Sequence, residues 1–504
     1  MTHAKLHSRY QPQAEADRYI RALAIRPDAD SFILIEPGLG YLVQALRQLR
    51  PECRIAVLHA DSSFREAEVL CPDVPAWYPD SGTGVQEFLE SAIPDTAVVQ
   101  IIEWKPSIAA FGEGCLALVR ESAEFAKRAA ASRRTGAAFG RRWLRNFFRN
   151  LAIVQETLLY RTMDTPVVIT GSGPSLEAAL PQIREHRDGL FVMAASSSLP
   201  ALAAAGIVPD MIVSTDGGGW ALLHLHACFR SQDVPVQFRL TAEKNRLTTP
   251  AVLTWPSLTS VETKLTVPTT LALAFTAAIP SQCAAFPVLP ISDGSLWQSI
   301  ALNAVGIPSA LIPQRGTVTA SALELAMALS TGGIYLAGMD LAVSDIRSHA
   351  RPYGFDHLFF GTASRLRPVY SQCFARSGDI RAGGSHDVYA AWFNSRLASW
   401  PRRIFSLGGN HAAFENALPA RPLEGGKRND DSVFKAVAVP GSPQGRCDRA
   451  FEALADALGK EQYAATLAGE LAPLLFPSHK EVSAGEIVEA LRCIAARYRG
   501  QAGG

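Results

Sequence analysis

Short apolar runs and amphipathic stretches alternate along most of the chain. Runs rich in Val, Ile and Leu are typical of strands that are buried on both faces of a parallel sheet. We expect such strands at 32–35, 54–59, 98–102, 167–170, 190–195, 211–214, 252–255, 310–312 and 334–337. Helical periodicity between most of these runs predicts βαβ units, so the expected fold class is α/β.

The same pattern divides the chain into distinct parts. We expect a Rossmann-like N-terminal domain over 1–114, a helical basic connector over 115–165, and a doubly wound α/β domain over 166–422. A polar, glycine-containing stretch follows and is typical of a linker. The remaining residues, 423–504, predict a helical region. Amphipathic helices are expected there at 446–460, 461–475 and 483–498.

Composition and charge narrow the function classes. The chain of 504 residues is 48% apolar and 19% charged, as globular proteins are, and its formal net charge is +1. A charge so near zero does not indicate nucleic acid or an acidic membrane as a partner. Eight scattered cysteines, a polar N-terminus and the lack of a membrane-length apolar run predict a cytoplasmic protein without a membrane span.

Basic and aromatic residues are interleaved in the connector. They are Trp143, Phe147 and Phe148 with Arg128, Arg133, Arg134, Arg141, Arg142, Arg145 and Arg149. Such a mixture can bind nucleic acid or an acidic partner. A charged, solvated helix face over an apolar stripe is commoner, and we favour that interpretation.

The strongest candidate for chemistry is the turn after strand 167–170, which has the sequence Gly171-Ser172-Gly173-Pro174-Ser175. Glycine allows a tight turn and close approach to a ligand, and the helix that follows offers N–H groups and a positive dipole end to a phosphate. A bulky residue at Gly173 should then block a nucleotide and spare the fold. A structural strand-to-helix turn is the other interpretation.

Polar residues follow several strands of the same domain. Because the carboxyl ends of parallel strands meet at one edge of a sheet, we expect these residues to line one crevice. They are Ser196, Ser197, Asp216 and Asp340, joined by Gly316, Thr317 and Thr319 where a helix is expected to begin. The last three form either an anion site or simple N-capping. A long loop with His349 follows Asp340 and is typical of a lid or binding loop.

A second glycine turn lies in the N-terminal domain. The strand 32–35 continues into Gly38-Leu39-Gly40, and Asp61 follows the next strand. An acidic residue about 20 positions after the glycines is where a nucleoside-binding fold places a ribose contact. An S-adenosylmethionine pocket is therefore one interpretation. Because the third glycine of the fingerprint is missing, we favour a structural Rossmann-like unit.

Several of these segments, in this order, resemble the motility accessory factor family, bacterial glycosyltransferases that act on flagellin. The segments are 171–176, 205–210, 214–216, 316–319 and 338–342 with His349. The sequence 32–40 with Asp61 is similar to the N-terminal domain of that family. The central segment also resembles the bacterial sialyltransferases, which use CMP-activated donors, and the MptE-like 6-hydroxymethylpterin diphosphokinases.

The first resemblance implies a CMP-nonulosonate-dependent protein O-glycosyltransferase that supports flagellum assembly and motility. The donor would carry a pseudaminic, legionaminic or sialic-type acid, and the acceptors would be Ser or Thr hydroxyls of flagellin. The resemblance places Gly171, Ser172, Gly173 and Ser175 on the phosphate, Ser196, Ser197 and Asp216 on cytidine and ribose, and Gly316, Thr317 and Thr319 on the nucleotide or sugar carboxylate. No resident cofactor is implied, and a need for a divalent metal stays open.

A histidine is the candidate general base, because its ordinary pKa lies near neutrality. His349 is favoured, and His386 is the alternative because the sialyltransferase histidine lies further downstream; Asp340 is a third catalytic candidate. The tyrosines that those enzymes carry near this aspartate are missing, since Ala342 and Val343 stand there. Two other classes remain open. One is a pterin diphosphokinase whose carboxylates hold Mg²⁺, and the other is a non-catalytic flagellar assembly or binding protein.

Overall fold

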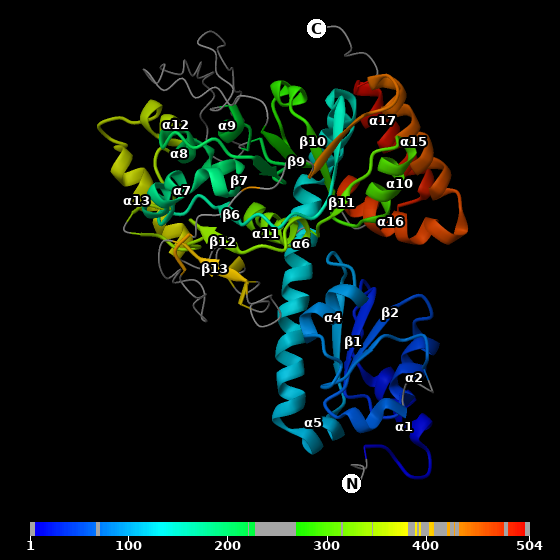
Figure 1. Cartoon of the computed structure of the whole chain (residues 1–504). Coiled ribbons are helices and arrows are strands. Elements are labelled where there is room, and N and C mark those ends of the chain that lie inside the picture. The colour runs from blue at the N-terminus through cyan, green and yellow to red at the C-terminus, as the bar shows by residue number, and fades with distance from the viewer. Residues whose placement is uncertain are drawn as a thin grey trace. The chain divides into compact units, whose positions relative to one another are not determined.

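A computed structural model of the chain shows two compact units, residues 1–138 and 139–504 (Figure 1). It describes residues 6–66, 71–219, 221–226, 269–313, 316–344, 346–381, 389–390, 393–394, 403–407, 421–423, 428, 433–477 and 482–498. The division falls inside the 41-residue helix α6 (Glu113–Ile153), whereas the sequence predicted boundaries at both ends of a connector. The predicted central and C-terminal regions share one unit.

The first unit is a four-stranded sheet in the order β3-β2-β1-β4 with every pairing parallel. Its elements are α1 (Pro12–Ala22), β1 (Ser31–Ile35), α2 (Tyr41–Leu49), β2 (Arg54–Leu58), the 3₁₀ helix η1 (Ser62–Glu66), β3 (Ala76–Trp77), α4 (Val85–Ala92), β4 (Val99–Glu103) and α5 (Lys105–Phe111). All five residues of β1 are buried, because it is the inner strand between β2 and β4. This is the predicted Rossmann-like arrangement, and it is confirmed.

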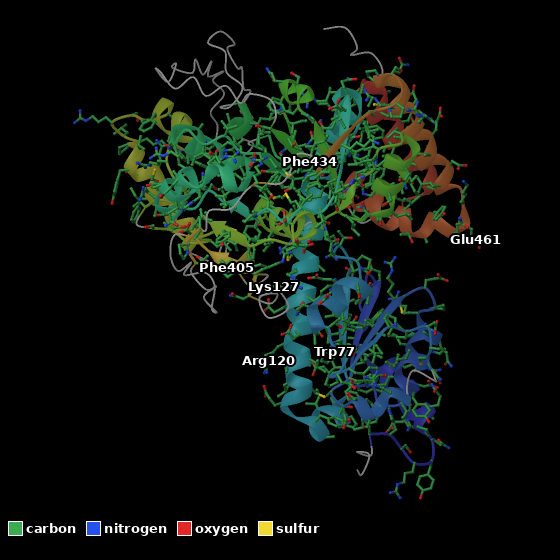
Figure 2. All side chains as sticks on the ribbon, viewed as in Figure 1. Trp77, Arg120, Lys127, Phe405, Phe434 and Glu461 are labelled. Atoms are coloured by element: carbon green, nitrogen blue, oxygen red, sulfur yellow. The ribbon has the colours of Figure 1, made fainter. Side chains whose placement is uncertain are left out.

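Helix α6 shows why the connector combines basic and apolar residues. In the first unit Arg120 and Lys127, both labelled in Figure 2, are exposed, and Phe125 is buried. In the second unit Phe147 and Phe148 are fully buried in the core. The aromatic residues therefore serve packing, as the apolar-stripe interpretation predicted.

Two arginines of α6 make hydrogen bonds within the second unit, in addition to any contact with solvent. The Arg141 side chain donates from Nε to the Leu475 carbonyl at 2.7 Å, and Arg149 donates to the Ile279 carbonyl at 2.6 Å. Each of these hydrogen bonds pairs a backbone carbonyl oxygen. A typical hydrogen bond contributes about 1 kcal/mol to stability, and one with a charged donor contributes more. Replacing Arg141 and Arg149 should therefore lower the stability of the second unit.

The second unit contains a ten-stranded sheet in the order β13-β12-β6-β7-β8-β9-β10-β5-β14, with β11 paired to β10. Its pairings are parallel except that of β14 with β5. The strands are β5 (Glu156–Tyr160), β6 (Val167–Thr170), β7 (Phe191–Ala195), β8 (Met211–Ser214), β9 (Thr270–Ala274), β10 (Val288–Ser292), β11 (Ala310–Leu311), β12 (Ile334–Ala337), β13 (Ile404–Ser406) and β14 (Phe434–Ala438).

Helices connect these strands, and the predicted α/β class is confirmed. They are α7 (Leu176–Glu185), η3 (Ser196–Ser198), α8 (Leu199–Ala204), α9 (Ala221–His226), α10 (Leu296–Ala304), α11 (Val318–Leu329), α12 (Asp356–Gly361) and α13 (Val369–Arg381). The strand expected at 252–255 lies outside the described residues. Among the residues that the structure describes, every helix is too short or too polar to cross a bilayer.

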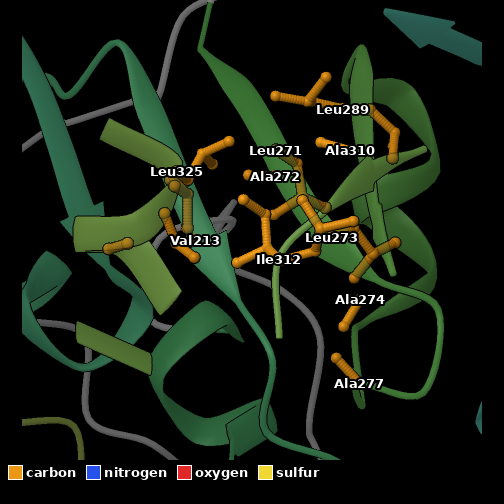
Figure 3. Close-up of a cluster of buried hydrophobic side chains, with 14 of the residues drawn as sticks. Val213, Leu271, Ala272, Leu273, Ala274, Ala277, Leu289, Ala310, Ile312 and Leu325 are labelled. Carbon is orange, nitrogen blue, oxygen red and sulfur yellow. The ribbon is translucent and has the colours of Figure 1, made fainter. Parts of the chain in front are cut away.

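The core of the second unit lies between its sheet and the covering helices (Figure 3). Val213, Leu271 and Leu273 extend from β8 and β9 toward Ile312 and Leu325, and all five side chains are buried. Burying one such side chain contributes about 1.5–3 kcal/mol. This core fixes the strands whose carboxyl ends carry the candidate site.

The predicted C-terminal helices are present as α15 (Pro443–Leu458), α16 (Glu461–Leu475) and α17 (Ala484–Ala495). Ser483 and Glu486 form a reciprocal capping box at the start of α17. The fully buried Arg446 donates to the carbonyls of Ala152 and Val154 at the end of α6. A buried guanidinium on the last carbonyls of a helix ties these helices to the sheet domain.

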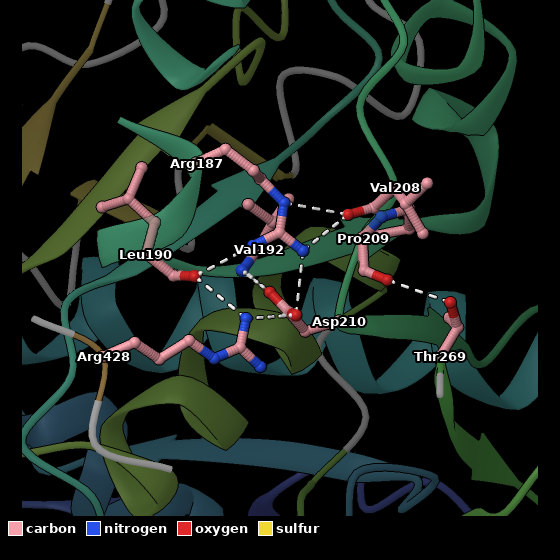
Figure 4. Close-up of polar contacts among 8 residues, drawn as sticks. All are labelled: Arg187, Leu190, Val192, Val208, Pro209, Asp210, Thr269 and Arg428. Carbon is pink, nitrogen blue, oxygen red and sulfur yellow. Dashed lines mark hydrogen bonds and ion pairs between the residues drawn. The ribbon is translucent and has the colours of Figure 1, made fainter. Parts of the chain in front are cut away.

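Asp210 directly precedes β8 and has a structural role (Figure 4). Its carboxylate pairs with Arg187 at 2.8 Å and with Arg428 at 2.6 Å, and it accepts the Val192 N–H at 2.7 Å. These contacts lie at the amino end of the strands. They are therefore on the edge of the sheet opposite the candidate site.

Candidate functional site

The order of strands in the large sheet reverses between β6 and β12. From β6 the chain proceeds to β7 and β8 on one side, and β12 pairs with β6 on the other side over its whole length. In open parallel sheets, ligands bind outside the carboxyl ends of the strands at such a reversal. The predicted glycine turn follows β6 and Asp340 follows β12, so both lie at this point.

The glycine turn is packed directly against the segment that follows β12. The Gly171 N–H donates to the Ala337 carbonyl at 2.8 Å, and the Gly173 N–H donates to the Gly338 carbonyl at 2.7 Å. A Cβ atom on Gly173 would lie 2.8 Å from the Gly338 oxygen and would collide with the Asp340 carboxylate. Contact between two loops therefore requires glycine here, whether or not a phosphate binds.

Asp340 occupies the positive end of α7. Its Oδ2 accepts hydrogen bonds from the Ser175 hydroxyl at 2.8 Å and from the Ser175 N–H at 3.2 Å. The N–H groups of residues 176–178 bond to carbonyls of the turn itself. The anion at this helix terminus is thus the protein's own carboxylate. The predicted phosphate contact stays a prediction, and a phosphate here would have to share the turn with Asp340.

Removing that carboxylate should destabilise the protein. We expect Asp340→Ala to lower the free energy of unfolding by about 1–2 kcal/mol, as the loss of an N-terminal cap does. Ser175→Ala is the matched control, because it removes one donor and leaves the carboxylate on the Ser175 N–H; its effect should be smaller. Urea unfolding of the two variants measures the difference, and equal stability of Asp340→Ala and the parent protein would contradict the capping role.

The predicted serines divide into two kinds. The Ser197 hydroxyl donates to the Ser172 hydroxyl at 3.0 Å, so the ends of β6 and β7 are joined. Ser196 is 3% exposed and lies below this surface. The Ser172 carbonyl accepts the Ala350 N–H at 2.8 Å, which holds the loop of His349 against the turn. Ser172 and Ser197 are therefore half-buried at the carboxyl ends of β6 and β7, whereas Ser196 is buried.

Asp216 is exposed at the end of β8. Its Oδ1 accepts the Gly218 N–H at 2.7 Å, and its backbone carbonyl accepts the Ala278 N–H at 2.9 Å. These bonds hold the backbone of the β8 turn and orient the carboxylate. The predicted ribose contact of Asp216 stays a prediction.

The start of α11 shows the N-capping that the sequence left open. Thr317 Oγ1 accepts the Ala320 N–H at 3.0 Å and lies 2.9 Å from Thr319 Oγ1. Gly316 has a φ of +77°, a conformation that glycine adopts without strain. Capping by Thr317 is confirmed. An additional anion contact of Gly316, Thr317 and Thr319 stays a prediction.

The loop after Asp340 is tied to α7. Arg347 pairs with Glu177 at 3.0 Å, and the same carboxylate accepts the Arg351 N–H at 2.9 Å. Leu341 has a φ of +46°, which costs a residue with a side chain of order 1–3 kcal/mol and is found mainly at functional sites. The loop is therefore held in a defined and partly strained conformation.

An open pocket lies between this loop and helices α12 and α13, with about 350 Å³ of empty space that includes open solvent. Its lining includes His349 and three arginines; the full set is Ile346, Arg347, Ser348, His349, Arg351, Tyr353, Asp356, Phe359, Cys373 and Arg376. The imidazole of His349 stacks on the Tyr353 ring, with centroids 3.9 Å apart, and its Nδ1 is 2.7 Å from the Ser348 hydroxyl. His386, the alternative base, lies outside the described residues.

Tyr353 connects this pocket to the end of β8. Burial raises the pKa of Tyr353 to about 12, and the charges of Asp356 and Asp216 contribute to the increase, whereas Arg376 opposes it. The guanidinium of Arg376 lies over the rings of Tyr353 and Phe355, 5.9 and 5.7 Å from their centroids. The charge of Asp216, after the end of β8, is thus near enough to the loop of His349 to affect the pKa of Tyr353.

Sequence reasoning missed Arg376 and Arg351. Arg376 is on α13, far from every glycine or aspartate motif, and only the folded chain brings it over the aromatic rings of the loop. No local signal distinguishes it from the other arginines of the chain.

The neighbouring His224 supplies a prediction about pH. Burial, and then the charge of Arg376, lower the pKa of His224 from 6.5 to about 4. The unfolded chain therefore binds a proton between about pH 6.5 and pH 4 that the folded protein does not bind, and stability falls as the pH decreases through this window. The loss should approach about 3 kcal/mol.

Denaturant unfolding at several pH values measures this slope. His224→Gln should flatten the part of the slope between pH 6.5 and pH 4, because glutamine does not titrate there. An unchanged slope in the variant would show that other groups cause it.

A model of the 6-hydroxymethylpterin diphosphokinase MptE-like family matches residues 141–251. This stretch contains the glycine turn, Ser196 and Ser197 of η3, and Asp216. A protein of Treponema pallidum (strain Nichols) is 27% identical over 335 residues, which is 66% of this chain and 65% of that protein. A second protein of the same organism is 36% identical over 81 residues, 16% of this chain and 39% of its own length. The chain thus spans less than two thirds of both relatives.

A solved structure, that of the MAf glycosyltransferase from Magnetospirillum magneticum AMB-1, is similar over 97% of this chain and 83% of that chain. The sequence identity is 14% and the TM-score is 0.45. The MptE-like group that the central segment resembles is thus also the family whose model matches this chain.

Proposed function

We propose that the chain is a glycosyltransferase that transfers a nonulosonic acid from a CMP-activated donor to Ser or Thr hydroxyls of flagellin. The observation that carries the proposal is the arginine-lined pocket with His349 beside the strand reversal. A CMP-linked nonulosonate has a phosphate and a carboxylate, and both are matched by guanidinium groups. The reaction would take place in the cytoplasm and support flagellum assembly and motility.

The roles of the residues follow from their positions. Arg351 and Arg376 would bind the anionic groups of the donor, since Arg347 is already paired with Glu177. Asp216 and Ser197, at the ends of β8 and β7, would contact the nucleoside. His349 would remove the proton of the acceptor hydroxyl, with Tyr353 and Ser348 holding its ring. The hydroxyl oxygen then attacks the anomeric carbon directly, the bond to the phosphate breaks, and CMP leaves.

A second candidate comes from the name of the matching family model. A pterin diphosphokinase would bind ATP with Mg²⁺ at the same strand ends, with Asp216 as an available carboxylate. Calorimetric titration with CMP, and separately with ATP and Mg²⁺, distinguishes the two. Binding of ATP with Mg²⁺ and no binding of CMP would favour the diphosphokinase.

Donor affinity provides a sharper test of the pocket. We expect Arg376→Gln to weaken the binding of the CMP-linked nonulosonate by about tenfold to a hundredfold, because a charge-assisted hydrogen bond contributes about 1.5–3 kcal/mol. Arg365→Gln is the matched control, since Arg365 is exposed and outside the pocket lining. If the two variants bound the donor with equal affinity, the donor would not bind in this pocket.

A further inference from the structure

In the second unit, side chains of helix α6 hold the turns that follow β8 and β9. The amide of Asn150 holds the turn after β9: the side chain is fully buried, and Nδ2 donates to the carbonyls of Phe275 and Ala277, both at 2.8 Å. Buried carbonyls need such donors, because an unpaired buried acceptor is costly. The turn after β9 is therefore fixed to the helix.

Asn146 connects the two turns to each other. Its Nδ2 donates to the Thr276 carbonyl at 2.9 Å, after β9, and to the Gly217 carbonyl at 3.2 Å, after β8. One amide nitrogen carries two protons and can serve both acceptors. The Ala278 N–H adds a further link, because it donates to the Asp216 carbonyl at 2.9 Å. The turn that carries Asp216 is thus held at two consecutive carbonyls.

Trp143 explains why residue 217 is a glycine. Gly217 is buried, and a Cβ there would lie 2.2 Å from Cδ1 of Trp143 and 2.9 Å from the Thr276 oxygen. The indole ring therefore occupies the space that any side chain would need. A Cβ on Gly219, in the same turn, would meet no other atom within 4 Å. Close packing on α6 is thus specific to the residue next to Asp216.

The carboxylate of Asp216 lies outside this anchored backbone. The residue is exposed, and its Oδ1 accepts the Gly218 N–H at 2.7 Å. Groups that recognise a ligand must be held within about 0.5 Å of their working positions by the residues around them. A short turn with three glycines cannot supply that rigidity alone, because glycine has the greatest backbone freedom. The contacts from α6 supply it.

We propose that Asn146 and Trp143 are positioning residues, which hold the backbone beneath Asp216 so that its carboxylate meets the bound nucleotide. The inference rests on the proposed function in one respect, namely that Asp216 contacts the nucleotide. It applies equally to the ribose of CMP and to ATP with Mg²⁺, because both candidate functions use this carboxylate.

A double-mutant cycle tests whether Asn146 acts through Asp216. Calorimetric titration of the full chain with CMP, and separately with ATP and Mg²⁺, measures the affinity. Asn146→Leu keeps the shape of the side chain and removes the donor, and it should weaken nucleotide binding by about threefold to tenfold. In the Asp216→Ala background the same substitution should have no further effect, because no carboxylate is left to position. A role in folding alone would weaken binding equally in both backgrounds.

Two glycines of the turn provide a matched pair. Gly217→Ala forces the turn away from Trp143 and should weaken binding about as much as Asn146→Leu, whereas Gly219→Ala adds the same methyl group in open space and should keep the parent affinity. Hydrogen exchange without nucleotide gives a second measurement. A peptide that covers residues 211–219 should exchange faster in Asn146→Leu and Gly217→Ala than in Gly219→Ala.

The outcomes separate this inference from the proposed function. Binding of CMP with parent-like affinity in Asn146→Leu and Gly217→Ala, or in Asp216→Ala, would overturn the positioning role alone. Equal losses from Asn146→Leu with and without the Asp216 carboxylate would overturn it as well. If ATP with Mg²⁺ bound and CMP did not, the proposed function would fail, and the cycle with ATP would decide the positioning role. Binding of neither nucleotide would overturn both proposals.

Discussion

Gly173→Ala should destabilise the second unit by about 1–3 kcal/mol, even though it adds only one methyl group. The added carbon would meet the Gly338 oxygen at 2.8 Å and collide with the Asp340 carboxylate. The carboxylate can rotate, but it would then leave the Ser175 hydroxyl and N–H that it now accepts from. The backbone carbonyl can move only with β12. The sequence led to the expectation that replacement of Gly173 would spare the fold. That expectation is wrong because it assumed free space at Gly173, and the structure has none there.

The same methyl group at Gly469 is the control. Gly469 lies within α16, and a Cβ there would meet no other atom within 4 Å. Glycine in a helix is less favourable than alanine by roughly 0.5–1 kcal/mol, so Gly469→Ala should be neutral or stabilising. Thermal and urea unfolding of both variants give the comparison. Parent-like stability of Gly173→Ala would mean that the two loops separate easily and that the turn is free for a phosphate.

The strands with β-branched residues could be predicted because their signal is local. Val167-Val168-Ile169 and Phe32-Ile33-Leu34 are apolar and β-branched enough to indicate buried strands directly. β9 was missed because Thr270-Leu-Ala-Leu-Ala consists mainly of helix formers, and its position between β8 and β10 overrides that preference. β10 was missed because Pro290 argues against a central strand.

The candidate site could be predicted in its parts but not in its connections. A polar residue after a buried strand is visible in the sequence, so Ser172, Ser197 and Asp340 were all named. That Asp340 caps α7 depends on β12 lying beside β6, and these strands are far apart in the chain. The cation over Tyr353 depends on the path of α13, for which the sequence has no local signal. The sequence therefore identifies the residues at strand ends, but their contacts with one another depend on the strand order, which the sequence does not show.

His349→Ala should reduce transfer to the acceptor by about 10²- to 10⁴-fold while CMP affinity stays nearly constant. A general base acts on the acceptor hydroxyl, so its loss lowers kcat and leaves the binding of the donor nucleotide unchanged. His349 is favoured because it lines the arginine pocket and its ring is held by Tyr353 at 3.9 Å. Partial recovery at higher pH is expected, because the acceptor hydroxyl then needs less assistance.

Two substitutions separate the base from its surroundings. Tyr353→Phe keeps the stacked ring and should lower transfer only slightly, whereas His349→Gln keeps polarity without a comparable base and should behave like His349→Ala. His386→Ala should cause a smaller loss than either His349 variant. If the double replacement of His349 and His386 retained full transfer, neither imidazole would be the base. The carboxylate of Asp216, exposed at the end of β8, would then be the group to replace, because Asp340 is held by the start of α7.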